Sequence, residues 1–235
     1  MIKYELPFDL DIAEEIINYH YNFYGNYLNN KKIMNFIKDN KSKDRMFYVL
    51  NCCDLNNPSK REQFIIALAY NLLSKEYNNY AIKYLKMYLA DNKYYIKNFK
   101  PEMEPVDSIS YQWLIFYKAL AIKYDDNLEY DKALKYIDMA LHIDFSMCKE
   151  YEEPYLMYAQ ISYHLNDYTN IKKILTRGIK ETKSNYNKQK YSEELKRYLL
   201  LEKNNKIYKP NNTIRKRIDV NTGSIYNLTT GEIIK

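Results

Sequence analysis

Small and apolar residues recur along the chain at a spacing that suits pairs of packed helices. Three times, a small residue is followed twelve residues later by a second packing position and seven residues after that by a third. The three sets are Ala69/Ala81/Tyr88, Ala121/Ala133/Ala140 and Ala159/Ile171/Gly178, and the aliphatic residues after their third members are Leu89, Leu141 and Ile179. Such a recurrence is typical of stacked helical hairpins, because each hairpin buries its apolar face only against a neighbour. It predicts an all-α fold, an α-α superhelix.

The apolar periodicity also predicts where the helices of these hairpins lie. The predicted pairs are 60–75 with 78–92, 109–124 with 130–144, and 154–165 with 168–181. Ser59 and Glu62 have the spacing of a capping box at the start of the first pair. A last amphipathic helix is predicted over 188–203, with Leu195, Tyr198 and Leu199 facing inward and its Lys and Glu residues facing outward. Such a helix would cap the end of the array with a polar outer face.

Both ends of the chain differ from the repeats. Residues 1–58 predict helices over 11–28, 31–38 and 44–55, which form either a cap or a divergent repeat. Residues 59–204 hold the repeats and the capping helix. Residues 205–235 form a basic, β-prone tail with short runs at 213–220, 224–228 and 232–234. The tail is either an arm that pairs with a partner's sheet edge or a frayed end.

The second predicted hairpin resembles the tetratricopeptide repeat (TPR) family. Its first helix carries a leucine–small–tyrosine pattern and its second a Tyr-Asp-x-Ala pattern. The matching residues are Tyr117, Leu120, Ala121, Tyr124, Tyr130, Asp131, Ala133, Ile137, Ala140 and Leu141. The turn Asn166-Asp167-Tyr168 of the third hairpin is similar to the family's turn. The resemblance covers about residues 60–182 and implies a TPR-like solenoid with a binding groove along its concave face.

A second resemblance is to the helical tail that follows family 2 glycosyltransferase domains in some proteins of bacteria and large DNA viruses. The residues that carry it are Arg61, Phe64 and Ala67, and later Glu152, Glu153, Pro154, Tyr155, Tyr158 and Ala159. No sugar-nucleotide-binding α/β domain precedes them in this sequence. The resemblance therefore implies an accessory or remnant helical module of a glycosyltransferase system, without catalysis.

The net charge of +6 is unevenly distributed. Residues 172–218 contain fifteen Lys or Arg against four Glu, which makes this stretch +11 and the remainder −5. A basic third of this kind attracts nucleic acid, an anionic membrane or an acidic protein, with Arg215, Lys216 and Arg217 as its densest patch. The alternative is a solvated helix face. Because the excess of Lys, Asn and Tyr is typical of an A/T-rich genome, the lysines carry little functional weight.

Cysteine usage and hydropathy indicate the compartment. Three cysteines (Cys52, Cys53 and Cys148) without framework spacing suit a reducing environment. The acidic N-terminus does not resemble a signal peptide, and no apolar run is long enough to span a membrane. The expected location is the cytoplasm, either of the source cell or of a host cell.

The sequence offers little that suggests catalysis. Asp9-Leu10-Asp11 has the Asp-x-Asp form that glycosyltransferases use for a metal and a nucleotide diphosphate, but it precedes a predicted helix, so capping is the better interpretation. No His or Cys spacing fits a metal, and no phosphate loop or nucleophile elbow is present. Trp113 and the tyrosines are interpreted as core residues. We expect a protein that is not an enzyme and binds no cofactor or metal.

The function predicted from these patterns is protein–protein interaction, as an adaptor or scaffold. If the repeats stack as in the TPR family, the first helix of each hairpin lines the groove that binds a partner peptide or helix. The expected groove residues are Ile66, Tyr70, Leu73, Lys118, Ile122, Asp125, Leu156, Gln160 and Tyr163. The alternatives are the glycosyltransferase accessory module and nucleic-acid binding through the basic third, while the oligomeric state stays open.

Overall fold

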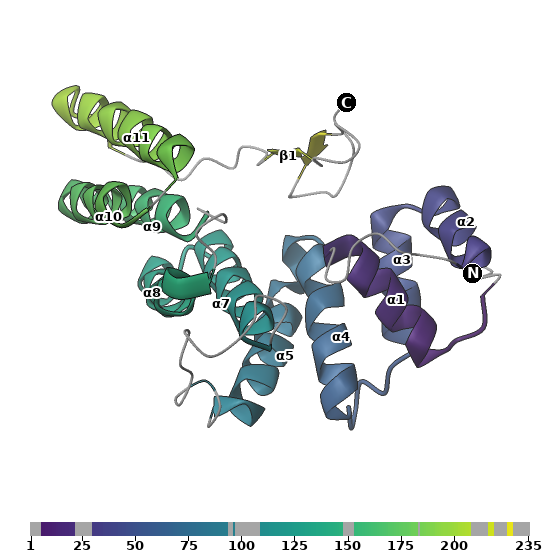
Figure 1. Ribbon diagram of the computed structural model, residues 1–235. Helices are drawn as coiled ribbons and strands as arrows, with labels where there is room; N and C mark the ends of the chain where they lie inside the picture. The colour runs from purple at the N-terminus through teal and green to yellow at the C-terminus, as the bar shows by residue number, and fades with distance from the viewer. Residues whose placement is uncertain are drawn as a thin grey trace. The chain divides into compact units, whose positions relative to one another are not determined.

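The computed structural model describes residues 6–21, 30–93, 96, 109–147, 153–182, 184–207, 216–218 and 225–227. The fold is all-α, built from helices that pack against their neighbours in sequence (Figure 1). The chain divides into two units, the first made of Met1–Asn92 with Thr213–Lys235 and the second of Lys93–Asn212. The boundary between the units thus falls inside the segment 59–204 that the sequence groups as one array.

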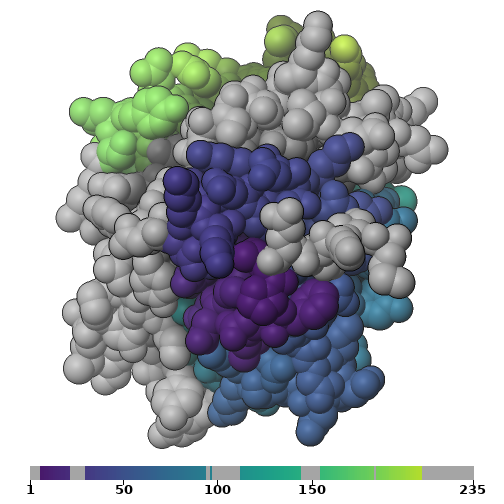
Figure 2. Space-filling view, turned by 90° about the vertical axis from the view of Figure 1, so that its right-hand side faces the viewer, coloured from purple at the N-terminus to yellow at the C-terminus, as the bar shows by residue number. Residues whose placement is uncertain are grey.

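The first unit begins with three short helices, α1 (Leu10–Tyr21), α2 (Lys31–Asp39) and α3 (Ser42–Asn51). Asp9 caps α1, because its carboxylate accepts hydrogen bonds from the Asp11 and Ile12 N–H groups at 2.8 and 3.2 Å. Helix α1 packs against α2, α3 and the following helix, α4 (Lys60–Leu72). In Figure 2 the purple α1 lies between the dark blue of α2 and α3 and the paler blue of α4. Arg61 on α4 forms ion pairs with Asp11 and Glu14 on α1.

Helices α4 and α5 (Asn78–Asp91) form the hairpin of the first unit. The predicted capping box is present: Ser59 accepts a hydrogen bond from the Glu62 N–H, and the Glu62 carboxylate accepts one from the Ser59 N–H at 2.8 Å. These bonds satisfy N–H groups that the first turn of a helix leaves without partners. A 3₁₀ turn at Lys75–Tyr77 links the two helices.

Four tyrosines stack in this hairpin. The ring of Tyr70 on α4 lies 5.7 Å from that of Tyr84 and 5.3 Å from that of Tyr80, both on α5, and 6.2 Å from that of Tyr77 in the link. The ring planes are within 27° of parallel. Only 8% of Tyr70 remains exposed. The stack holds α4, the link and α5 together through aromatic contact area.

The second unit contains the hairpins α7 (Ile109–Asp126) with α8 (Tyr130–Met147) and α9 (Glu153–His164) with α10 (Tyr168–Glu181). Helix α11 (Asn185–Lys203) follows. Helix α8 packs against α9, and α10 against α11, so the unit is a stack in chain order. One core cluster joins the last four helices, with Leu141, Tyr155, Ala159, Ile171, Ile174, Leu175, Tyr191 and Tyr198 as its buried members.

The small residues of the repeats lie at the helix contacts. Ala121, Ala133 and Ala140 are all fully buried. A Cβ added at Gly178 would approach the Tyr191 ring to 3.0 Å and the Tyr155 ring to 3.1 Å. Gly178 is therefore the point where α10 meets aromatic side chains from α9 and from α11. The prediction that small residues allow these helices to pack closely is confirmed in the second unit.

Three helices of the second unit end in the same turn. Two residues after its last helical residue, each of these helices has a residue with a positive φ. These residues are Leu128 with 64°, Asn166 with 59° and Asn205 with 48°. In each case the next N–H donates to the carbonyl five residues earlier, from Glu129 to Tyr124 at 2.8 Å, from Asp167 to Ser162 at 2.9 Å and from Lys206 to Leu201 at 3.0 Å. This is a Schellman motif at the C-termini of α7, α9 and α11. The same motif thus ends three of the helices along the stack.

Most of the predicted helices are present, with local differences. Helix α3 ends at Asn51 rather than 55, and α4 ends at Leu72 rather than 75 because Leu73 and Ser74 are extended before the 3₁₀ turn. Residues 22–28 of the first predicted helix lie outside the described residues. The prediction that Leu199 faces inward was wrong, because this side chain is 40% exposed. The buried residues of α11 are Asn187, Tyr191 and Tyr198.

Two short strands lie in the predicted β-prone tail. Strand β1 (Lys216–Ile218) pairs antiparallel with β2 (Ile225–Asn227), and Arg217 is opposite Tyr226. The run at 232–234 lies outside the described residues. No helix in the described part of the chain has the length and apolar character needed to cross a membrane.

Candidate functional site: a pocket between α9 and α11

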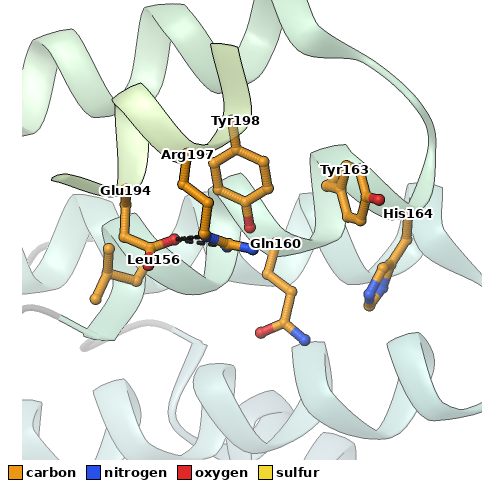
Figure 3. Close-up of a pocket in the computed structure, with 7 residues that line it drawn as sticks. All are labelled: Leu156, Gln160, Tyr163, His164, Glu194, Arg197 and Tyr198. Atoms are coloured by element: carbon orange, nitrogen blue, oxygen red, sulfur yellow. Dashed lines mark hydrogen bonds and ion pairs between the residues drawn. The ribbon is translucent and has the colours of Figure 1, made fainter. Parts of the chain in front are cut away.

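A pocket of about 460 Å³ lies between α9 and α11 of the second unit (Figure 3). Its volume is in the usual range of small-ligand and side-chain pockets. The lining residues are Leu156, Gln160, Tyr163 and His164 from α9, and Glu194, Arg197 and Tyr198 from α11. On α9 they follow the spacing i, i+4, i+7, i+8 and on α11 the spacing i, i+3, i+4, which places them on one face of each helix.

Two tyrosines form the aromatic wall of the pocket. The Tyr163 and Tyr198 rings have their centroids 5.4 Å apart and their planes tilted by 52°. Tyr198 is only 3% exposed, and burial raises the pKa of its hydroxyl above the usual value. Tyr163 also makes an edge contact with Tyr168 at 6.1 Å. The wall is therefore a fixed aromatic surface, held from α9, α10 and α11.

An ion pair lies across the α11 side of the pocket. Arg197 donates hydrogen bonds from Nε and Nη2 to Oε2 of Glu194, at 2.9 and 2.6 Å. The guanidinium carbon also lies 4.3 Å from the centroid of the Tyr198 ring, a cation–π contact. Figure 3 shows Arg197 reaching from α11 toward Gln160 on α9. Glu194 and Tyr198 thus fix the position of the one guanidinium among the lining residues.

His164 connects the pocket to α7. Its Nδ1 lies 2.5 Å from Oδ1 of Asp125, and both side chains are almost completely buried. The imidazole also packs against the Tyr130 ring of α8 at 5.4 Å. A buried polar pair of this kind orients its members, because each loses hydrogen-bond partners if it turns away. His164 is therefore held in place by α7 and α8 while it lines the pocket.

The structure brings together only some of the predicted groove residues. Leu156, Gln160 and Tyr163 line the pocket. Asp125 lies behind it, buried against His164, while on the same helix Lys118 is half-buried and Ile122 is exposed.

The three predicted groove residues on α4 belong to the first unit, where Ile66 is fully buried and Tyr70 and Leu73 are nearly so. They are core residues of that unit.

Sequence reasoning missed four of the lining residues. Glu194, Arg197 and Tyr198 lie on the helix that was interpreted as a polar-backed cap, and His164 ends the helix of the third hairpin. The spacing of the three α11 residues was visible in the sequence. What the sequence did not show is that α11 packs on α10 so that these side chains meet the pocket residues of α9.

The basic third of the chain is partly neutralised. Lys172 pairs with Glu202 at 2.8 Å, Arg177 with Glu181 at 2.9 Å and Arg197 with Glu194. Lys216 and Arg217 of the predicted basic patch lie on β1, and Arg215 lies outside the described residues. The acidic partners lower the local excess of positive charge on α10 and α11.

The other candidate motifs have structural roles where they are described. Asp9 caps α1 and Asp11 pairs with Arg61, so the interpretation of Asp9-Leu10-Asp11 as a capping sequence is confirmed. Trp113 is 1% exposed, as predicted for a core residue.

The two described cysteines are held by the backbone of α3. The Cys52 and Cys53 thiols donate hydrogen bonds to the carbonyls of Tyr48 and Val49, and burial raises the pKa of Cys53 to about 12. Among the described residues no three His, Cys, Asp or Glu side chains are grouped to hold a metal ion.

Comparisons of the chain with protein-family models, with curated proteins and with solved structures gave no match.

Proposed function

We propose that this protein is a non-catalytic adaptor or scaffold of the TPR type, and that the second unit binds a peptide or helix of a partner protein. The observation that carries the proposal is the pocket between α9 and α11. Its lining combines two tyrosines and a leucine with four polar or charged side chains, a mixture that suits recognition of a protein segment through both aromatic and polar contacts.

The position of the pocket supports the same function. Helices α7 and α9 are the first helices of two successive hairpins, and α11 follows α10 in the place where a further first helix would lie. In TPR-like arrays the first helices line the concave groove in which partners bind. Two further predicted groove residues, the half-buried Lys118 and the exposed Ile122 on α7, are accessible to a partner that extends beyond the pocket.

Site-specific photocrosslinking tests the proposal. A benzoylphenylalanine replaces either Gln160, which is exposed in the pocket, or Thr176, which is exposed on α10 and does not line it. We expect protein adducts from position 160 in lysate of the native host and few from position 176, because the crosslinker reacts only with a partner that lies against it. Adducts are identified by mass spectrometry.

Nuclease treatment of the same lysate separates the two classes of partner. Adducts that survive nuclease support a protein partner. Loss of the adducts after nuclease, together with a steep decrease of binding between about 50 and 200 mM salt, would point to nucleic acid on the basic third instead. Equal labelling from positions 160 and 176 would show that this face has no special role.

A further inference from the structure

We infer that the α9–α11 pocket receives an uncharged aromatic side chain from an extended peptide of the partner protein. The inference rests on the proposed function and names the chemistry of the partner. Three properties of the lining residues lead to it: the aromatic wall, the cancellation of charge and the hydrogen-bonding groups beside the wall.

The wall favours a ring over an aliphatic or polar group. The rings of Tyr163 and Tyr198 lie 5.4 Å apart with their planes tilted by 52°. Tyr198 is 3% exposed and carries the Arg197 guanidinium over its ring, so the half-buried Tyr163 is the ring that an inserted side chain meets. A ring placed against Tyr163 makes aromatic contacts in addition to its loss of apolar surface from water. Leu156 supplies an aliphatic contact at the Glu194 end of the pocket (Figure 3). An inserted ring thus meets aromatic and aliphatic surfaces together.

The charges of the pocket do not favour an ionic ligand. Glu194 and Arg197 are the carboxylate and the guanidinium of the lining set, and they are paired with each other. The fourth α9 residue of the set, His164, directs Nδ1 to the Asp125 carboxylate. A phosphate or a C-terminal carboxylate would have to compete with Glu194 for Arg197, and a cation would have to compete with Arg197 for Glu194. A charged side chain would therefore lose its hydration without gaining an uncommitted counter-ion.

The polar groups beside the wall suit a peptide backbone. A guanidinium has five N–H donors, and Glu194 Oε2 accepts two of those of Arg197, so donors remain for a carbonyl even beside the Tyr198 hydroxyl. Gln160 is exposed across the pocket and offers an amide N–H and an amide carbonyl. Donors and an acceptor next to the Tyr163 ring match the alternation of N–H, C=O and side chain along an extended segment.

Peptide selection on the 235-residue chain tests this inference. Phage-displayed random dodecapeptides serve as the probe, and we expect the enriched sequences to share Phe, Tyr or Trp at one position. Replacing that residue by Ala, Glu or Lys in a synthetic peptide is expected to weaken binding about tenfold or more, measured by fluorescence polarisation.

Two matched protein variants localise the binding. Gln160→Trp fills the pocket with a bulky side chain and is expected to weaken binding about tenfold or more, whereas Thr176→Trp places the same side chain on exposed α10 and leaves the affinity unchanged. Circular dichroism of both variants is the control for folding. In Glu194→Gln the pocket carries the unpaired charge of Arg197, and we expect it to bind the Glu-substituted peptide more tightly than the original protein does.

The outcomes distinguish this inference from the proposed function. Enrichment of peptides without an aromatic residue, or binding that Gln160→Trp does not change, would overturn the aromatic anchor and leave peptide binding by the protein intact. A selection that enriches no peptide, in a protein that also gives no nuclease-resistant adducts from position 160, would overturn both.

Discussion

The same position of the repeat pattern is buried on the first helix of one hairpin and exposed on the first helix of another. Tyr70 follows Ala69 on α4, and Gln160 follows Ala159 on α9, so the two occupy equivalent places in the sequence pattern. Tyr70 is buried beneath Tyr77, Tyr80 and Tyr84, whereas Gln160 is exposed in a pocket. The repeat pattern therefore establishes which positions are equivalent, and the neighbouring elements decide whether such a position is core or binding surface.

The links between the helices explain much of this difference. In the first unit a 3₁₀ turn places Tyr77 against Tyr70, and α5 adds Tyr80 and Tyr84. In the second unit, Schellman turns around Leu128 and Asn166 connect the helices, and Ile122 and Gln160, the residues equivalent to Tyr70, are exposed. The face stays open until α11 lies across from α9 and forms the pocket.

The largest expected effect comes from truncating the two equivalent side chains. Tyr70→Ala removes a buried ring from a four-ring stack and is expected to lower the free energy of unfolding by about 3 kcal/mol. Gln160→Ala removes an exposed side chain and is expected to change it by less than about 0.5 kcal/mol. Urea unfolding followed by circular dichroism measures both. Equal losses in the two variants would mean that the two positions do not differ in burial.

The polar pair behind the pocket gives the next effect. In the first unit the position equivalent to Asp125 is the buried Leu73, whereas Asp125 satisfies His164. Asp125→Ala leaves the buried imidazole without this partner, so we expect a loss of about 2 kcal/mol in the free energy of unfolding. Asp138→Ala, at an exposed position of α8, is the control and should have little effect. A loss no larger than that of the control would contradict the role of the pair.

The third repeat position tests how close the helices approach. In α5 this position is Tyr88, whose own ring packs on Phe64 at 5.6 Å, while in α10 it is Gly178, which receives rings from α9 and α11. Gly178→Val should therefore lower the free energy of unfolding by about 1–2 kcal/mol, because Tyr155 and Tyr191 have to move. Thr176→Val, two residues earlier on the exposed face, is the control in the same urea experiment. A stabilised Gly178→Val variant would show that the rings have space to move.

The smallest effect concerns the repeated turn. Leu128 has a φ of 64° and is 54% exposed, so its side chain adds backbone strain and little burial. Leu128→Gly is expected to raise the free energy of unfolding by about 0.5–1 kcal/mol, since glycine adopts this conformation without a Cβ contact. Asn166→Gly in the matching turn should change it less, because asparagine already tolerates positive φ. A destabilised Leu128→Gly variant would indicate that the leucine side chain contributes to packing.

Much of the fold was predictable because its signals are local. The spacing of Ala121, Ala133 and Ala140 predicted a close hairpin, and the capping box at Ser59 predicted where α4 begins. Three of the pocket residues, Leu156, Gln160 and Tyr163, followed from the face of a single helix. Helix periodicity and caps depend on residues a few positions apart, which a single sequence displays directly.

The sequence by itself determined the helices, their pairing into hairpins and the small residues at their contacts. Only the tertiary structure decided that Ile66, Tyr70 and Leu73 are buried and that Glu194, Arg197 and Tyr198 complete a pocket with α9. The physical reason is that exposure depends on which other element covers a helix face. The covering element is another helix or link, such as the 3₁₀ turn beside Tyr70 or α11 across from α9. The repeat pattern of one helix face does not show which element that is.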